Sequence, residues 1–226
     1  MRLFGPNVTD YAKVEPNGLR FQLPAARDSG DDIGLECKRT VRGDFEIIVS
    51  YELLGIPDPA PENGAGAIVQ VYFDTPDIGR ARLTRTQKTK AATFGASYLT
   101  DTPDGKQNFK GLSFPLADAK VMTGRLRLLR TGTTLAYDVN EGGTGFRTIA
   151  TKEVGAADVV AVRTIATTGW KAFPVDVRFG NLQINSNGPN AAIVPLAPLV
   201  VDDPHSGPGA GRADTWFWLG VVLAVV

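Results

Sequence analysis

The fold class is decided by one stretch, Phe45-Glu46-Ile47-Ile48-Val49-Ser50-Tyr51-Glu52-Leu53. Every second residue of it is apolar, and the residues between are mostly polar. An apolar period of two is typical of a β-strand that buries one face and exposes the other. The stretch therefore predicts a strand at the surface of a β-sheet whose inner face is packed against a core.

Outward from this stretch, ten further runs have the length and residue types of strands. They are Leu19–Leu23, Ile33–Thr40, Ala67–Phe73, Ala81–Thr86, Thr93–Thr100, Arg125–Arg130, Thr133–Val139, Phe146–Thr151, Val159–Thr167 and Val175–Ile184. Turn-forming pairs such as Asn63-Gly64 and Thr131-Gly132 separate them. About eleven short strands with regular turns predict an all-β fold, an antiparallel sandwich of two sheets.

Composition excludes several function classes. The chain has 226 residues, 43% of them hydrophobic, and its 24 basic and 24 acidic residues cancel. A formal net charge of zero argues against a protein built mainly to bind nucleic acid. With a single cysteine, Cys37, and a single histidine, His205, the chain cannot form an internal disulfide or a cysteine-based zinc site. His205 lies in a Pro/Gly-rich stretch, which disfavours a Ser-His-Asp triad.

The composition changes along the chain, and this predicts four parts. Residues 1–18 form an N-terminal arm, 19–186 the sandwich domain, 187–215 a Pro/Gly-rich linker and 216–226 an apolar segment. Five prolines in the third part favour an extended linker. Its centre, Ile193–Val201, is apolar enough to pack along the sandwich instead.

The last part, Trp216–Val226, carries no charge over 11 residues. A membrane-spanning helix needs about 20 residues, so the run is short for one. Trp216 and Trp218 resemble the aromatic belt at a membrane interface. We expect a truncated or unusually short membrane anchor, with the side of the membrane left open, and a buried terminal strand as the alternative.

Three segments resemble concanavalin A-like and laminin G-like domains. The segment Gly124–Asn140, continued by Gly145–Ile149, is similar to a hairpin of these domains, with a Thr-Gly turn between its strands. Val175–Ile184 resembles their closing strand, and Gly43–Val49 an early one. A similar arrangement occurs in a domain of unknown function frequent in planctomycete bacteria. The resemblance implies a jelly-roll sandwich, and its motifs are structural rather than catalytic.

Trp170 is the first candidate for ligand binding. It follows Thr167-Thr168-Gly169 in a predicted turn, and a tryptophan in a loop can stack on the apolar face of a sugar ring. The alternative is that its large ring closes the end of the sandwich. Tyr51 and Tyr137 occupy strand positions and are expected in the core.

Two acidic groups suggest other chemistry. Asp44 and Glu46 are two residues apart, roughly 7 Å along a strand, a separation found in pairs of glycosidase carboxylates. They carry the alternative function, a jelly-roll glycoside hydrolase, although the compact acidic signature of such enzymes is missing. The loop Asp28-Ser29-Gly30-Asp31-Asp32 could offer oxygen ligands to calcium, but its ligand pattern is incomplete, so we predict no metal site.

Basic residues gather in the middle of the chain. Residues 80–130 have a net charge of +8, against −6 for residues 1–79. Arg80 and Arg82 share one strand face, and Arg125 and Arg127 share another. If the two strands are neighbours, these arginines form a basic stripe able to meet an anionic polymer. The alternative is a solvated sheet face whose arginines pair with acids of adjacent strands.

Together these patterns predict a non-enzymatic binding or structural module without a cofactor. Its candidate ligands are a glycan or an anionic polymer, and its candidate binding residues are Trp170, Arg80, Arg82, Arg125 and Arg127.

Overall fold

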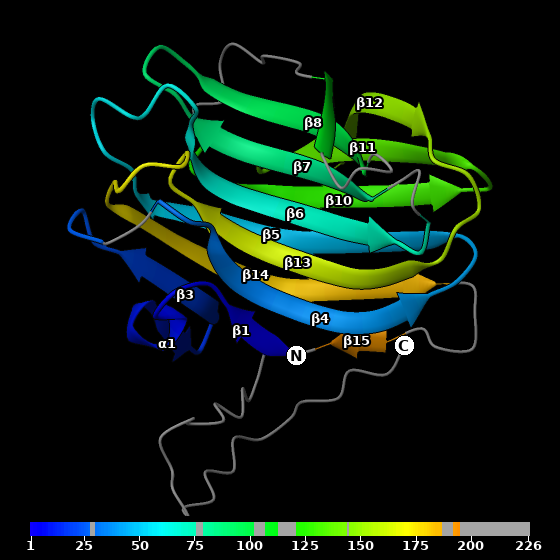
Figure 1. Ribbon diagram of the computed structural model, residues 1–226, viewed down its shortest axis with the longest axis horizontal. Helices are drawn as coiled ribbons and strands as arrows, with labels where there is room; N and C mark the ends of the chain where they lie inside the picture. The colour runs from blue at the N-terminus through cyan, green and yellow to red at the C-terminus, as the bar shows by residue number, and fades with distance from the viewer. Residues whose placement is uncertain are drawn as a thin grey trace, which may run out of the picture.

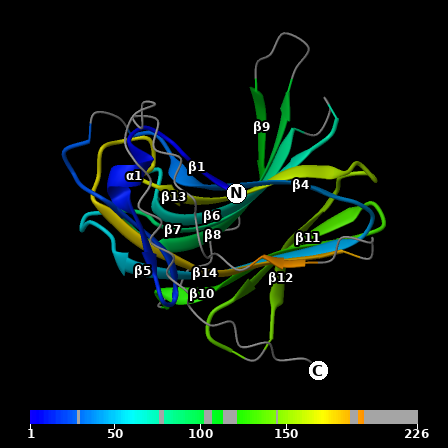
Figure 2. The same ribbon diagram turned by 90° about the horizontal axis from the view of Figure 1, so that it is seen from below.

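A computed structural model describes residues 1–27, 30–75, 79–101, 107–112, 121–143, 145–186 and 192–194. In these ranges the chain forms two stacked sheets whose strand pairs are all antiparallel. Figure 1 shows one sheet in front of the other, and Figure 2 shows the two layers from below. The predicted all-β antiparallel sandwich is confirmed.

The first sheet has seven strands in the order β1-β4-β13-β6-β7-β8-β9. Their bounds are Arg2–Phe4 for β1, Ile33–Val41 for β4, Val159–Thr167 for β13, Ala65–Phe73 for β6, Arg80–Gln87 for β7, Ala92–Asp101 for β8 and Gln107–Leu112 for β9. Its outer face, turned toward the viewer in Figure 1, is called the front face. β9 projects from this sheet on the side away from the second one (Figure 2).

The second sheet has eight strands, seven of them in the order β12-β11-β10-β5-β14-β3-β2, with β15 paired to β14. Their bounds are Arg147–Glu153 for β12, Thr134–Asn140 for β11, Thr123–Thr131 for β10, Phe45–Gly55 for β5, Val175–Ser186 for β14, Gly18–Leu23 for β3, Ala12–Glu15 for β2 and Ala192–Val194 for β15. Its outer face is called the back face. A short helix, α1 (Val8–Tyr11), connects β1 and β2.

The core fills the space between the sheets. On β5 the apolar residues of alternating sequence, Phe45 to Leu53, are all buried there, as their period of two predicts. Tyr51 and Tyr137 also lie in the core, which confirms that prediction. Two arginines, Arg85 and Arg130, are buried as well, and their guanidinium groups donate to backbone carbonyls.

The predicted boundaries of the sandwich are wrong at the N-terminal end. Residues 1–18 are not an arm, because β1 pairs with β4 and β2 pairs with β3. These strands have only three and four residues, too few to show a period in the sequence.

At the other end, β15 pairs with β14 through Leu182–Ile184, so the first described residues of the predicted linker pack along the sandwich. The remaining residues of that segment, with His205 and the apolar run Trp216–Val226, lie outside the described residues. Among the described residues, no helix has the length and apolar character needed to span a membrane.

Candidate functional site

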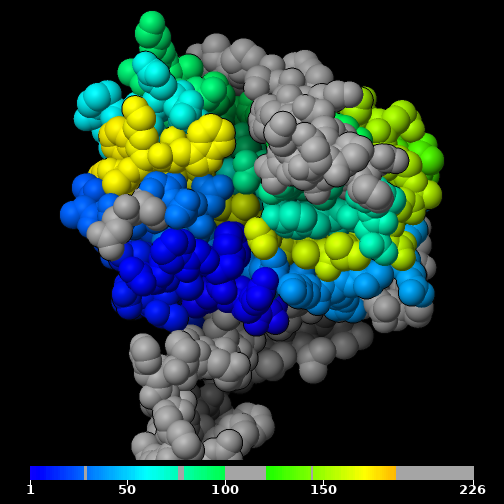
Figure 3. All heavy atoms as spheres, in the orientation of Figure 1, coloured from blue at the N-terminus to red at the C-terminus, as the bar shows by residue number. Residues whose placement is uncertain are grey.

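The front face contains a cleft of about 420 Å³. Its floor is made by β6, β7 and β8, and its rim by the loops that carry Asp32, Asn63 and Trp170. Figure 3 shows the surface hollowed between the yellow atoms around residue 170 and the green atoms of β7 and β8. The cleft therefore lies over one end of the seven-stranded sheet.

The floor is polar because small hydroxyl residues alternate with core residues on two strands. On β7, Ala81 and Leu83 point into the core, while Arg82, Thr84 and Thr86 line the cleft. On β8, Thr93 and Ser97 line it in the same way. The Thr86 and Thr93 hydroxyls are 3.2 Å apart and hydrogen-bond to each other, and Thr84 Oγ1 donates to the Gly95 carbonyl at 3.3 Å. Such a surface offers hydroxyl groups to a polar ligand.

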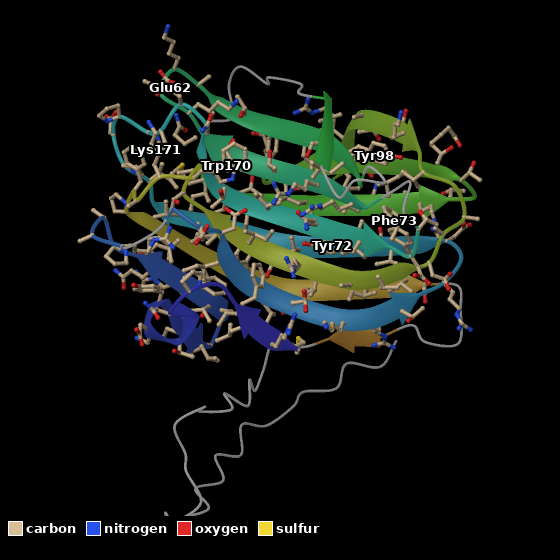
Figure 4. All side chains as sticks on the ribbon, viewed as in Figure 1. Glu62, Tyr72, Phe73, Tyr98, Trp170 and Lys171 are labelled. Carbon is tan, nitrogen blue, oxygen red and sulfur yellow. The ribbon has the colours of Figure 1, made fainter. Side chains whose placement is uncertain are left out.

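Trp170 stands at the rim of the cleft. Its residue exposure is 69%, the highest of the large hydrophobic residues exposed in the described part of the chain. Figure 4 shows it over the front face, at the same end as Glu62 and Lys171 and away from Tyr72 on β6. The alternative that its ring closes the end of the sandwich is therefore wrong.

The backbone that carries Trp170 is strained. Gly169 and Trp170 have φ values of 68° and 66°, and the left-handed region costs a non-glycine residue about 1 kcal/mol or more. Asn63 Nδ2 donates to the Gly169 carbonyl at 3.3 Å. A Cβ on Gly30 would lie 2.3 Å from the Trp170 carbonyl carbon, so the chain at Gly30 packs directly against this turn. Neighbouring loops thus fix the backbone that carries the exposed ring.

A buried arginine ties the same two loops together. Arg27 Nη2 donates to Thr168 Oγ1 at 3.1 Å, and Arg27 Nη1 donates to the Asp31 carbonyl at 3.2 Å. Thr168 Oγ1 in turn donates to the Gly30 carbonyl at 3.2 Å. Burial lowers the pKa of Arg27. These bonds position the Trp170 turn against the Asp31–Asp32 segment.

A charged cluster extends from the cleft along the sheet. Arg82 Nε donates to Gln70 Oε1, and Arg82 Nη2 lies 3.4 Å from Asp32 Oδ2. Asp32 Oδ1 and Gln70 Nε2 are buried without a hydrogen-bond partner. Burial raises the pKa of Asp32, and the Arg82 guanidinium and Thr167 hydroxyl, which favour the ionised form, do not outweigh it. Burial also lowers the pKa of Arg82, although the charge of Asp32 opposes this.

The predicted basic stripe does not form. Arg80 and Arg82 are on β7, and Arg125 and Arg127 are on β10, which belongs to the other sheet. The condition for a stripe, two neighbouring strands, is therefore not met. Arg82 lines the cleft, and the Arg80 guanidinium lies 5.7 Å from the centre of the Tyr72 ring.

The other two arginines lie on the back face. Arg127 Nη1 and Nε pair with Glu46 at 3.0 Å and Asp138 at 2.9 Å. Arg125 and Arg127 both lie over the Phe146 ring. Arg82 and Arg127 therefore follow the alternative prediction, in which the arginines of a sheet face pair with acidic residues of neighbouring segments.

Asp44 and Glu46 do not lie at the cleft. Asp44 Oδ1 accepts from the Gly132 amide at 2.7 Å and so caps a turn. Glu46 pairs with Arg127 and accepts from Asn185 Nδ2 at 3.0 Å. Both carboxylates belong to the eight-stranded sheet or its turns and are used in structural contacts.

The acidic loop of residues 28–32 contributes one residue to the cleft, Asp32. Asp28 and Ser29 lie outside the described residues. Within the described ranges, no three acidic, cysteine or histidine side chains are grouped to hold a metal ion.

Sequence reasoning found Trp170 and Arg82 but missed the residues around them. The sequence predicts Asn63 as a turn former and Asp32 as a possible calcium ligand, and it contains no local signal for Gln70 or Lys88. Over Arg82–Thr86, the polar residues Arg82, Thr84 and Thr86 recur at every second position, which is a signal for a polar sheet face. Which loops meet at that face depends on strand pairing across the whole chain.

The stacked antiparallel sheets define an all-β sandwich of two sheets, with an open polar cleft on one outer face. The profile described as the C domain of a protein of unknown function, DUF1583, matches residues 1–189. The chain therefore belongs to this family, in line with the predicted resemblance to a domain of unknown function. A search of curated proteins found no match.

Solved structures with the same fold have little sequence identity to the chain. A functionally unknown protein from Saccharomyces cerevisiae matches with a TM-score of 0.57 and 12% identity, covering 82% of this chain and 95% of that one. A legume lectin-like domain from Entamoeba histolytica matches with a TM-score of 0.56 and 13% identity, covering 83% of this chain and 90% of that one. An alginate lyase from Klebsiella pneumoniae matches with a TM-score of 0.53 and 10% identity, covering 82% of this chain and 87% of that one. At such identities the likeness establishes the fold alone.

Proposed function

We propose that this chain is a non-enzymatic glycan-binding module whose ligand occupies the front-face cleft. The observation that carries the proposal is Trp170, an exposed ring on a held turn at the rim of a cleft floored by hydroxyl groups. A sugar ring has an apolar face that stacks on an aromatic ring and hydroxyls that need hydrogen-bond partners. The cleft offers both to one ligand. The fold shared with a lectin-like domain agrees with this function.

A binding assay tests the proposal. The full chain is screened against a glycan panel, and affinities of the ligands found are measured by calorimetry for wild type, Trp170→Ala and Lys171→Ala. We expect Trp170→Ala to weaken binding about tenfold, which corresponds to about 1.4 kcal/mol of lost contact. Lys171→Ala is the matched control, because Lys171 is the exposed neighbour of Trp170 and does not line the cleft. Binding that both variants retain in full would rule out this site.

The proposal includes that the module does not cleave its ligand. The engagement of Asp44 and Glu46 in structural contacts supports this. A hydrolysis assay on a polysaccharide panel tests it, with Glu46→Gln as the variant. Turnover that Glu46→Gln abolishes would establish the alternative function, a glycoside hydrolase.

We also propose that residues 216–226 tether the module to a membrane. The support is the uncharged sequence beginning with Trp216 and Trp218. Membrane fractionation of the chain with and without Trp216–Val226 tests the tether. We expect only the longer chain in the membrane fraction, and recovery of both chains in the soluble fraction would refute the tether.

A further inference from the structure

We propose that the glycan bound in the front-face cleft is acidic and carries uronate carboxylates. This inference rests on the proposed glycan-binding function and adds the chemical class of the ligand.

The first support is an excess of positive charge at the cleft. Two cationic residues, Arg82 and Lys88, and one acidic residue, Asp32, line it. Lys88 is partly exposed, and its ammonium group makes no ion pair with any described residue. A cation that protrudes into a cleft without a carboxylate partner attracts an anion from solution.

The second support is the orientation of Arg82. Its Nε is used by Gln70, and its Nη2 makes only a long contact, 3.4 Å, with Asp32. Its Nη1 has no hydrogen bond within the described part of the chain and is not buried. Because Gln70 fixes the plane of the guanidinium, a carboxylate can meet the remaining N–H groups without a large loss of side-chain freedom.

The third support is the difference from the neighbouring arginine on the same face. Arg163 on β13 donates to Glu36 at 2.7 Å and to the Tyr72 hydroxyl at 2.6 Å, and Arg2 donates to Glu36 at 2.7 Å. The charge of Arg163 is therefore balanced inside the protein. The excess positive charge on this part of the front face therefore comes from the cleft residues, not from Arg163.

The fourth support is Asp32, which selects a ligand with hydroxyls as well as charge. Asp32 lines the cleft with 18% of its side chain exposed, so its carboxylate offers an acceptor to a sugar hydroxyl. A uronate residue has a planar carboxylate for Arg82 and Lys88, hydroxyls for Asp32 and the cleft threonines, and a ring face for Trp170. A neutral sugar leaves Lys88 without an ion pair among the described residues, and Arg82 with only its long contact to Asp32.

Calorimetry with matched ligands tests the inference. The probes are oligogalacturonate and oligomannuronate, each as the free acid and as its methyl ester, a neutral xylo-oligosaccharide, and dextran sulfate as a sulfated polymer. We expect at least one free acid to bind tenfold or more tightly than its ester, and this preference to shrink as salt is added.

Three variants assign the preference to the cleft. Arg82→Gln and Lys88→Gln should each reduce the ratio of acid to ester affinity at least threefold. Arg125→Gln removes the same charge from the back face and should leave the ratio unchanged. Lys88→Gln keeps the test open should Arg82→Gln disturb the fold, because the Lys88 side chain makes no hydrogen bond or ion pair within the described residues.

The outcomes separate this inference from the function on which it rests. Equal binding of acid and ester, or binding of neutral glycans alone, with Trp170→Ala weakening both, would overturn the uronate assignment and keep the glycan-binding function. Dextran sulfate binding as tightly as the uronates would also overturn it, since charge alone would then suffice. The lack of any glycan binding would remove the proposed function itself.

Discussion

The two outer faces of the sandwich use the same charged residue types in different ways. On the back face, Arg20 is paired to Asp176, and Arg178 is paired to both Glu15 and Glu52, with contacts of 2.5–2.8 Å. Each of these side chains meets an opposite charge on a neighbouring strand. Such a network satisfies its own hydrogen bonds and has little to offer a ligand.

The cleft on the front face lacks such a fully paired network. Arg82 is only loosely paired to Asp32, Lys88 has no ion pair among the described residues, and buried polar atoms of Asp32 and Gln70 lack partners. An exposed Trp170 stands beside them. The difference indicates that the paired arginines of the back face, Arg20 and Arg178, serve the fold, while the charges in the cleft remain available for binding. The predictions below test this division through the free energy of unfolding.

The largest effect is expected on the back face, from Arg127→Ala. The Asp138 side chain beneath Arg127 is only 1% exposed, so the substitution leaves a buried carboxylate without its cation. Removal of one partner of a buried pair costs about 3 kcal/mol. Denaturant unfolding of the variant measures this loss. Arg125→Ala is the control, because Arg125 lies over the same Phe146 ring and makes no ion pair in the described part of the chain. Equal losses for both variants would mean that the pairing to Asp138 is not what stabilises this face.

The next-largest loss of stability is expected from Glu36→Gln, in the ion-pair cluster that Glu36 forms with Arg163 and Arg2 on the front face, away from the cleft. The Glu36 side chain is 3% exposed and accepts from Arg163 and Arg2. Burial disfavours its ionised form, but the bonds from the two arginines outweigh burial and hold the pKa of Glu36 below its ordinary value. We expect Glu36→Gln to lower the free energy of unfolding by about 2 kcal/mol at pH 7.

The pH dependence of this effect has a definite sign. Because the pKa of Glu36 is lower in the folded chain than in the unfolded chain, its ionisation stabilises the fold above the ordinary pKa of about 4.3. This contribution is lost as pH falls through the lowered pKa. Unfolding of wild type and Glu36→Gln at pH 7 and pH 3 should therefore show a difference that shrinks at the lower pH. A constant difference would assign the loss to packing.

The sequence alone predicted the fold because the main strands are long enough to show their period. Phe45–Leu53 alternates over nine residues, and β5 spans this run. Of the strands that escaped prediction, β1, β2 and β15 have three or four residues and gain their structure from pairing with neighbouring strands, while β9, with the sequence Gln-Asn-Phe-Lys-Gly-Leu, has no apolar period of two.

The candidate site was harder to predict because it is assembled from distant segments. The local sequence alone predicts Trp170 as an aromatic residue in a loop and Arg82 as a basic residue on a strand. That both line one cleft, with Asp32 and Asn63, follows from the pairing of β7 with β6 and of β6 with β13. The order of strands in a sheet cannot be predicted from a local sequence pattern. For the same reason, the sequence did not show that Arg125 and Arg127 belong to a different sheet from Arg80 and Arg82.

A smaller effect is expected from Gly30→Ala, at the base of the Trp170 turn. The new Cβ would lie 2.3 Å from the Trp170 carbonyl carbon, so the turn must move. We expect a loss of about 1 kcal/mol in the free energy of unfolding and, because the ring shifts, weaker glycan binding. Gly143→Ala is the control, since no atom lies within 4 Å of its added Cβ. Unchanged binding by Gly30→Ala would show that the position of the ring does not depend on this contact.

The smallest effect, and the one of opposite sign, is expected from Asp32→Asn. Because the pKa of Asp32 is raised in the folded chain, its ionisation disfavours folding. Below the ordinary pKa of about 3.9 the carboxyl is protonated in both states and the penalty vanishes; it grows as pH rises toward and through the raised pKa. Asp32→Asn should therefore be slightly more stable than wild type at pH 7 and equal to it at pH 3, as measured by denaturant unfolding. On the back face, Asp138→Asn should instead destabilise, because Asp138 faces Arg127 at 2.9 Å. A gain at Asp32 beside a loss at Asp138 would mean that the cleft keeps a carboxylate at the expense of stability, as expected of a group that serves a ligand; a loss at both positions would remove the distinction between the two faces.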